Sequence, residues 1–151
     1  MEKTNQLSAD EMLKHYWTGM IPVDTVYMAL SSKVRLISTN KVHVCHVEVD
    51  EPNNSYIIYI SSRLPRELMY YTIAHCLGHI HCGHLEDRRY LNNDQEHIQR
   101  FEEEANEYAR QLVAPVFALN IFKEKNITNP EKLSIALNVS EDVVKKQLST
   151  I

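Results

Sequence analysis

Hydrophobic positions recur with a helical period near the amino terminus, where the sequence also offers helix start signals. Ser8 and Glu11 form a capping-box pattern, which predicts a helix that runs from there to about Gly19. Pro22 suits the first turn of a second helix, which we expect to end near Ser31. The amino-terminal segment therefore predicts two short helices in succession.

The middle of the chain changes to a strand period. Residues 34–38, 42–49 and 56–60 are rich in β-branched and aromatic side chains, and the second segment alternates as a half-buried strand does. Residues 50–54, DEPNN, are typical of a hairpin turn between the last two strands. We therefore expect a small sheet with antiparallel pairing.

A helical period returns after the predicted sheet. Pro65 suits a helix start, and the helical pattern continues to about Gly83. The polar residues 85–96 predict a loop, and a second long helix is expected over about residues 97–113, after which Pro115 interrupts it. Two long helices joined by a polar loop are thus expected to follow the sheet.

The carboxyl-terminal segment carries two further cap signals. Asn129 and Pro130 supply the cap and first turn of one short helix, and Ser140 caps another. The length of 151 residues suits one domain with a sizeable core. We therefore expect a single α+β domain over residues 1–151, in which a small antiparallel sheet packs against several helices and residues 129–149 form a helical cap.

Composition and charge narrow the possible partners. Hydrophobic residues make up 44% and charged residues 24% of the chain, as in ordinary globular proteins. A net charge of −4 predicts no direct electrostatic affinity for nucleic acid or for an anionic membrane. No apolar run approaches the roughly 20 residues that span a bilayer. The odd cysteine count and a polar, acidic amino terminus unlike an export signal favour a cytoplasmic location.

The first long helix is expected to carry AHCLGHIHCGHL, residues 74–85. His75 and His79 stand four residues apart, the spacing at which helical side chains share a face and can hold one metal ion. Such a pair also arises by chance in a histidine-rich helix, but two unpaired imidazoles would be costly to bury in this apolar segment. In the zinc-peptidase pattern HExxH the second residue is a glutamate that activates water, and here Cys76 occupies that position.

A third ligand is expected from the second long helix, because catalytic zinc sites usually combine three protein ligands with one open position. Glu102 shares a helical face with two small residues and a leucine: Ala105, Ala109 and Leu112. The alanines let two helices approach closely, so Glu102 is the carboxylate best placed to reach the metal. Asn106, one turn after Glu102, could hydrogen-bond a ligand and fix its orientation.

The neighbouring polar residues are expected to lie outside the ligand set. Glu103 and Glu104 fall off the face of Glu102 and are expected to be solvated. Three residues are expected to be surface groups or supports of the ligands: His81, Cys82 and His84. Cys45, on a predicted strand, is most simply a small core residue.

Two segments together resemble the ImmA/IrrE family of zinc metallopeptidase-like proteins. The first family motif resembles AHELGHIxLGHL, where this chain has AHCLGHIHCGHL. The second resembles ExEANxFAxxLLxP, where residues 102–115 are EEEANEYARQLVAP, with Tyr108 in place of phenylalanine. The order, the separation and the closing proline agree, and the resemblance covers roughly residues 20–149.

The resemblance implies a zincin-like α+β fold, Zn²⁺ bound by His75, His79 and Glu102, and a catalytic base at position 76. It also implies action against a helix-turn-helix transcriptional repressor of the type found in phages and mobile elements. The chain departs from the family at Cys76, which is shorter than glutamate and has a reference pKa of about 8.5. General acid–base help contributes about 10²–10⁴ in rate, so its loss predicts intact metal binding with weak or absent proteolysis.

Several functions stay open at this point. A binding protein would capture a repressor without cutting it, receiving an extended segment at the strand YIIYI beside the metal helix. An active zinc-dependent endopeptidase would cleave the repressor, with another group or the zinc ion alone replacing the glutamate. Cys76 as a metal ligand or as a nucleophile ranks below simple loss of the base. Direct DNA binding through residues 134–148 is disfavoured, because Glu141 and Asp142 open the last helix.

Overall fold

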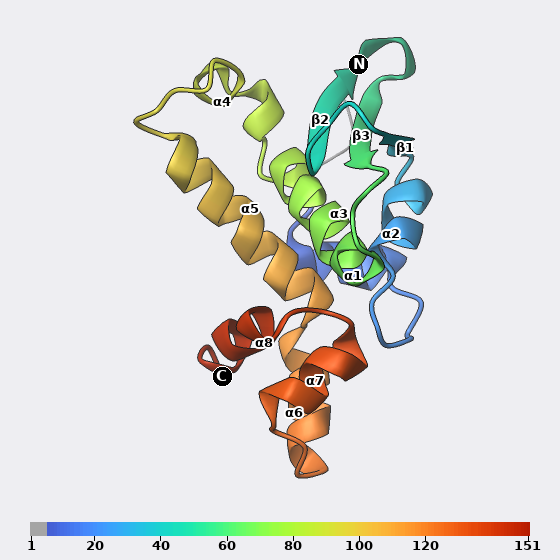
Figure 1. Cartoon of the computed structure of the whole chain (residues 1–151), viewed down its shortest axis with the longest axis vertical. Helices are drawn as coiled ribbons and strands as arrows, with labels where there is room; N and C mark the ends of the chain where they lie inside the picture. Colours follow the sequence, from blue (N-terminus) through green and yellow to red (C-terminus); the bar gives the residue numbers. More distant parts are fainter. Residues whose placement is uncertain (1–5) are drawn as a thin grey trace.

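The structure is a computed structural model that describes residues 6–151. Its centre is a pair of long helices, α3 (Arg66–His81) and α5 (Ile98–Val113), which pack against each other. The sheet and the two amino-terminal helices lie beside α3, and the carboxyl-terminal helices gather beyond the end of α5 (Figure 1). Both long helices agree with the sequence expectation to within two residues at each end.

The sheet has three strands, β1 (Arg35–Thr39), β2 (Cys45–Asp50) and β3 (Ser55–Ser61), in the order β1-β3-β2. β2 and β3 form the expected antiparallel hairpin through a short 3₁₀ turn, η1 (Glu51–Asn53). The expectation of an antiparallel sheet was wrong for β1, which pairs with β3 in parallel. The reason lies in the most apolar strand, β3, which takes the buried centre and inserts between β1 and β2.

The amino-terminal helices are α1 (Ala9–Tyr16) and α2 (Thr25–Ser31). The capping box is confirmed, because the Ser8 hydroxyl accepts from the Glu11 amide and the Glu11 carboxylate accepts from the Ser8 amide. α1 ends three residues before Gly19 because Trp17 adopts an extended conformation. α2 begins after Asp24, whose side chain caps it, rather than at Pro22.

The segment between the two long helices contains local structure that was not expected. A 3₁₀ turn, η2 (His84–Glu86), follows the left-handed Gly83, and a one-turn helix, α4 (Arg88–Leu91), follows it. The expectation of a loop was therefore wrong at these residues. Asp87 explains the helix, because its carboxylate caps the first turn and accepts from the Arg89 amide at 2.9 Å.

The carboxyl-terminal helices are α6 (Val116–Glu124), α7 (Pro130–Leu137) and α8 (Glu141–Leu148). Asn129 and Ser140 cap α7 and α8 as expected, whereas α6 was not expected after Pro115. Gln147 ties α8 to the end of α5 by donating to the Ala114 carbonyl at 3.0 Å. Among residues 6–151, no helix is long and apolar enough to cross a membrane.

The two long helices approach most closely at Gly78. A Cβ atom at this position would lie 2.8 Å from the carbonyl oxygen and 2.9 Å from the Cα of Ala105. Ala105 and Ala109 are completely buried, so the small-residue face of α5 is the one that contacts α3. This close approach places Glu102, which lies on the preceding turn of α5, against the histidines of α3.

We expect Gly78→Ala to destabilise the protein by about 3 kcal/mol, at the upper end of overpacking costs, because the clashing atoms are backbone and cannot rotate away. Unfolding in denaturant measures this change. Gly19→Ala is the control, because its φ of +84° makes alanine strained but its Cβ would meet nothing within 4 Å. That control should cost about 1–2 kcal/mol. Wild-type stability of Gly78→Ala would contradict the close helix approach.

Candidate metal centre

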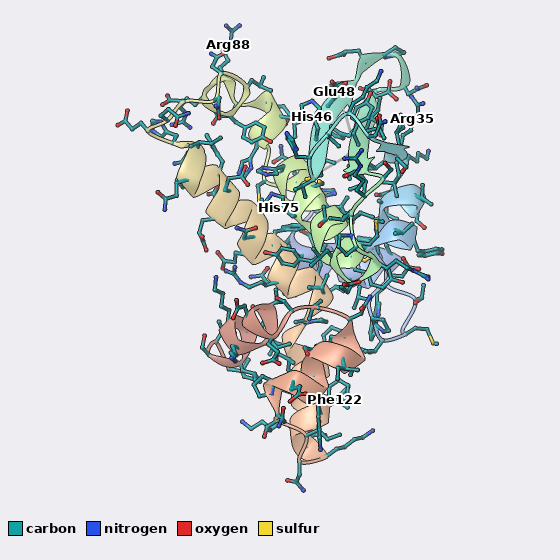
Figure 2. All side chains as sticks on the ribbon, in the orientation of Figure 1. Arg35, His46, Glu48, His75, Arg88 and Phe122 are labelled. Carbon is teal, nitrogen blue, oxygen red and sulfur yellow. The ribbon has the colours of Figure 1, made fainter. Side chains whose placement is uncertain are left out.

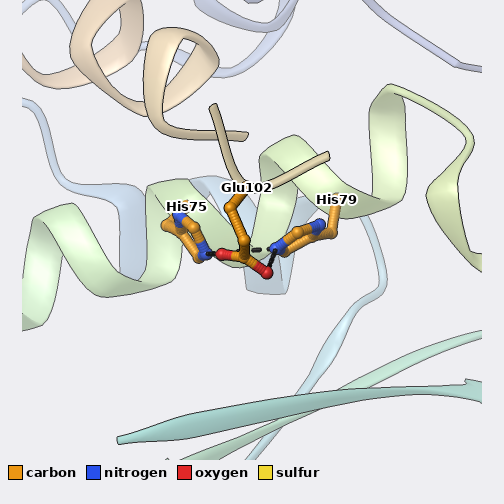
Figure 3. Close-up of side chains that lie close together, drawn as sticks. All are labelled: His75, His79 and Glu102. Atoms are coloured by element: carbon orange, nitrogen blue, oxygen red, sulfur yellow. Dashed lines mark hydrogen bonds and ion pairs between the residues drawn. The ribbon is translucent and has the colours of Figure 1, made fainter. Parts of the chain in front are cut away.

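The three predicted donor side chains meet between α3 and α5 (Figure 3). His75 and His79 occupy successive turns of α3, and their Nε2 atoms lie 3.0 Å apart. The Glu102 carboxylate reaches across from α5, with Oε2 3.1 Å from His75 Nε2 and Oε1 3.3 Å from His79 Nε2. The structure thus brings together the residues that were expected to share one metal ion.

The spacing of these donors fits a zinc ion. In a tetrahedral site with ligands about 2.0–2.1 Å from the metal, neighbouring donor atoms lie about 3.3 Å apart. The three separations observed are 3.0, 3.1 and 3.3 Å. Two imidazole nitrogens and one carboxylate oxygen are also a typical donor set for catalytic zinc. The residues present therefore suit the metal without a large rearrangement.

Asn106 supports His75 as the sequence suggested. Its Oδ1 accepts from His75 Nδ1 at 2.7 Å and from the Tyr71 hydroxyl at 3.1 Å. An amide oxygen only accepts, so His75 carries its proton on Nδ1 when neutral and directs the lone pair of Nε2 towards the other donors. Tyr71 was not anticipated, although it lies one turn before His75 on α3.

His84 and Glu104 lie behind His79. His84 was expected to be a surface group or a support of the ligands, and it is a support, whereas the contact of Glu104 was not anticipated. His84 Nδ1 lies 2.9 Å from His79 Nδ1, and His84 Nε2 lies 2.8 Å from Glu104 Oε1. Glu104 is exposed, as expected, and its carboxylate also contacts His84, which was not expected. The signal in the sequence was Gly83, whose left-handed conformation turns the chain after α3 and brings the next residue back against His79.

The charges of the site favour a cation. The imidazoles of His75 and His79 hold the pKa of Glu102 well below its usual range, so the carboxylate is ionised at neutral pH. Burial lowers the pKa of His79 and keeps that imidazole neutral. For His75, burial acts in the same direction, but the hydrogen bond and charge of Glu102 outweigh it and raise the pKa. A metal ion would compete with a proton at that imidazole.

The donors open into a cavity of about 420 Å³. Its other wall is the edge of the sheet, where residues 44–47 of β2 and the preceding turn line it. His46, on β2, and His75, on α3, both line this space (Figure 2). The cavity gives a substrate or a protein segment direct access to the donor atoms.

Cys76 lies at the position of the usual catalytic base and is completely buried. Its thiol forms a hydrogen bond with the thiol of Cys45 on β2, and this contact together with burial raises the pKa of Cys76 well above its ordinary value. A thiol that stays protonated at neutral pH is a poor proton acceptor. Cys45 is half-buried and lines the cavity, so it is not the simple core residue that was expected.

Two further residues of the first motif, Cys82 and His81, differ in their exposure to solvent. Cys82 is exposed, as expected. His81 is buried, its ring stacks on Tyr108 at an interplanar angle of 6°, and its Nδ1 accepts from the Leu7 amide at 3.0 Å. His81 therefore joins α3 to α5 and to the segment before α1, away from the donor cluster.

This arrangement defines a zincin-like, metallopeptidase-like protein: two histidines on one helix, a carboxylate from a second helix, and a sheet edge along the cavity. The family described as the IrrE N-terminal-like domain, a peptidase family, matches residues 28–149. The chain belongs to this family. No curated protein shows significant similarity to it.

Proposed function

We propose that the protein holds Zn²⁺ with His75, His79 and Glu102 and captures a regulatory protein at this site, with proteolysis weak or absent. One contrast carries the proposal. Three donor side chains converge at the cavity, while the neighbouring position 76 holds a buried thiol instead of a carboxylate. The bond to Cys45 and the raised pKa leave Cys76 unable to take a proton from an attacking water as glutamate does.

A zinc ion held here would act as a Lewis acid towards a peptide carbonyl and towards water. The residues of the chain supply the rest of the site: Asn106 orients His75, and the ionised Glu102 provides the negative charge that retains a cation. These features support the binding of a carbonyl-bearing segment of another protein. Rapid hydrolysis also needs a proton acceptor and a proton donor for the leaving amine, and position 76 supplies neither efficiently.

The surface proposed for capture is the outer edge of β2. The sequence suggested strand addition at YIIYI, but that strand is β3, which already pairs with β1 on one side and β2 on the other. In the described part of the chain β2 pairs with β3 alone, so its other edge offers backbone groups beside the cavity. An extended segment could add there and place one of its carbonyls near the donors.

We propose a helix-turn-helix transcriptional repressor as the captured protein, on the basis of the family resemblance. The test uses zinc-loaded protein and a helix-turn-helix repressor from the same genome, bound to a labelled operator. We expect release of the operator with intact repressor, measured by fluorescence anisotropy and mass spectrometry. Absence of both release and fragments would contradict capture, and zinc-dependent fragments would favour the alternative below.

A matched pair of variants locates the capture surface. Val44 lines the cavity next to β2 and is half exposed, so Val44→Asp should weaken release by placing a charge where an apolar segment docks. Ile135, on α7, is 75% exposed and lies among the carboxyl-terminal helices away from the cavity. Ile135→Asp should leave release unchanged. Equal effects of the two variants would remove the sheet edge from the proposal.

The second candidate is an active zinc-dependent endopeptidase acting on the same repressor. The observation that favours it is the complete donor triad beside an open cavity. Zinc alone activates water, so some hydrolysis is compatible with this geometry. Fragments that disappear with a chelator and in His75→Ala would select this candidate over capture.

A further inference from the structure

We infer that His84 and Glu104 are positioning residues, which hold His79 in the tautomer that donates its Nε2 lone pair to the metal. The inference rests on the proposed zinc site and extends it to two residues outside the ligand set. His84 follows α3 in η2, whereas Glu104 lies on α5, so the chain of contacts joins three elements around one ligand.

The hydrogen-bonding capacities of the three side chains determine which atom donates and which accepts in each contact. His84 Nε2 lies 2.8 Å from Glu104 Oε1, and a carboxylate accepts, so a neutral His84 carries its proton on Nε2. His84 Nδ1 is then an acceptor, and it lies 2.9 Å from His79 Nδ1. His79 must therefore donate from Nδ1, which leaves the lone pair on Nε2, the atom that faces Glu102.

Because His79 and His84 are buried, these two hydrogen bonds are the main determinant of the tautomer of His79. The side chains of His79 and His84 are 4% and 3% exposed, so water has little access to replace either contact. The Tyr90 ring packs against both imidazoles, with centroids 4.9 Å from His79 and 5.6 Å from His84. Phe101 packs edge-on against His84 at 4.8 Å. These rings prevent the two imidazoles from turning to find other partners.

The two histidine ligands are consequently supported in different ways. His75 donates to a neutral amide oxygen of Asn106, whereas His79 donates to an imidazole that is itself bonded to a carboxylate. The negative charge of Glu104 makes His84 a stronger hydrogen-bond acceptor. His79 Nε2 then becomes a more basic ligand towards a cation. Loss of such a supporting partner typically lowers metal affinity about 10–100-fold.

The experiment compares two replacements of His84. Leucine fills the space but accepts no hydrogen bond, so His84→Leu should lower zinc affinity about 10–100-fold, measured by competition with a chromophoric chelator. Asparagine places its Oδ1 where His84 has Nδ1, so His84→Asn should retain most of the affinity. The Nδ1–H signal of His79 in nitrogen NMR of the zinc-loaded protein should persist in His84→Asn and change in His84→Leu. If His84 only fills space, His84→Leu should instead keep more zinc affinity than His84→Asn.

Neighbouring glutamates provide the control for the carboxylate. Glu104→Gln should weaken zinc binding about 10-fold, because the acceptor loses its charge. Glu103→Gln removes the adjacent carboxylate on α5, which is 66% exposed and pairs loosely with Arg110 at 3.7 Å. That variant should bind zinc as the wild type does.

The outcomes separate this inference from the function on which it rests. A wild-type protein that takes up no zinc overturns the proposed site and the inference with it. A wild type that binds one zinc ion, together with unchanged affinity and an unchanged His79 signal in His84→Leu, overturns the positioning role alone. Equal losses in Glu104→Gln and Glu103→Gln would also overturn it, because a general charge effect would then suffice.

Discussion

Cys76→Glu should raise zinc-dependent peptide hydrolysis by about 10²–10⁴-fold over the unaltered protein, the usual contribution of a general base. The reason is that the donor triad and the cavity are already assembled, so the variant adds the proton acceptor to a formed site. The carboxylate would take a proton from the attacking water and return it to the leaving amine. A quenched fluorescent peptide and mass spectrometry of the repressor measure the gain.

Two companion variants make this prediction specific. Cys76→Gln has the shape of the glutamate without its basicity, so it should remain as slow as the wild type. The Cys45 thiol contacts position 76, which is completely buried, so a longer side chain needs room there. We therefore expect Cys76→Glu combined with Cys45→Ala to be at least as active as the single variant. Cys45 and Cys76 both line the cavity, and alanine at position 45 frees space on the side of β2.

The wild-type rate decides between capture and cleavage. Hydrolysis by the unaltered protein as fast as by Cys76→Glu would show that another group acts as the base and would overturn the capture proposal. Equal and negligible rates in Cys76→Glu and Cys76→Gln, with zinc bound in both, would show that the cavity no longer accepts a peptide productively. Only a faster hydrolysis rate in Cys76→Glu than in Cys76→Gln supports the missing carboxylate as the cause of slow proteolysis in the wild type.

Local signals predicted helices along the whole chain, including the two that carry the donors. The Ser8–Glu11 box, the Asn129 cap and the Ser140 cap are each confirmed by a hydrogen bond within the same turn. The apolar stretch around His75 and the small-residue face of α5 indicated that the two long helices pack against each other. Each of these patterns repeats within one helix and can therefore be recognised from the sequence. Such information lies within a few residues, where sequence order and spatial proximity coincide.

The remaining features depend on residues that are distant in sequence. The parallel pairing of β1 with β3 follows from competition among three strands for the buried centre, which no single strand encodes. The contact from Glu104 through His84 to His79 needs α3, η2 and α5 in place at once. Asn106 was found because it follows Glu102 by one turn, but its bond to His75 required the helix crossing.

His75→Ala should lower the zinc content from one equivalent to nearly none, and Glu102→Gln should weaken binding by more than about 100-fold, beyond the range for supporting partners. Each variant removes one of three converging donors, and the two that remain cannot complete the site. Elemental analysis of the purified proteins and chelator competition measure these losses. His46→Ala is the control, because that histidine lines the same cavity but lies outside the donor cluster.

Unfolding experiments give an independent reading of the same site. A metal that binds the folded state alone stabilises it by about 2.7 kcal/mol at a free concentration 100 times its Kd. Zinc should therefore raise the Tm of the wild type and of His46→Ala, and a chelator should reverse the shift. His75→Ala and Glu102→Gln should melt at the same temperature with and without zinc. Equal zinc-induced shifts in all four proteins would place the metal elsewhere, and a wild type insensitive to zinc would remove the metal from the site.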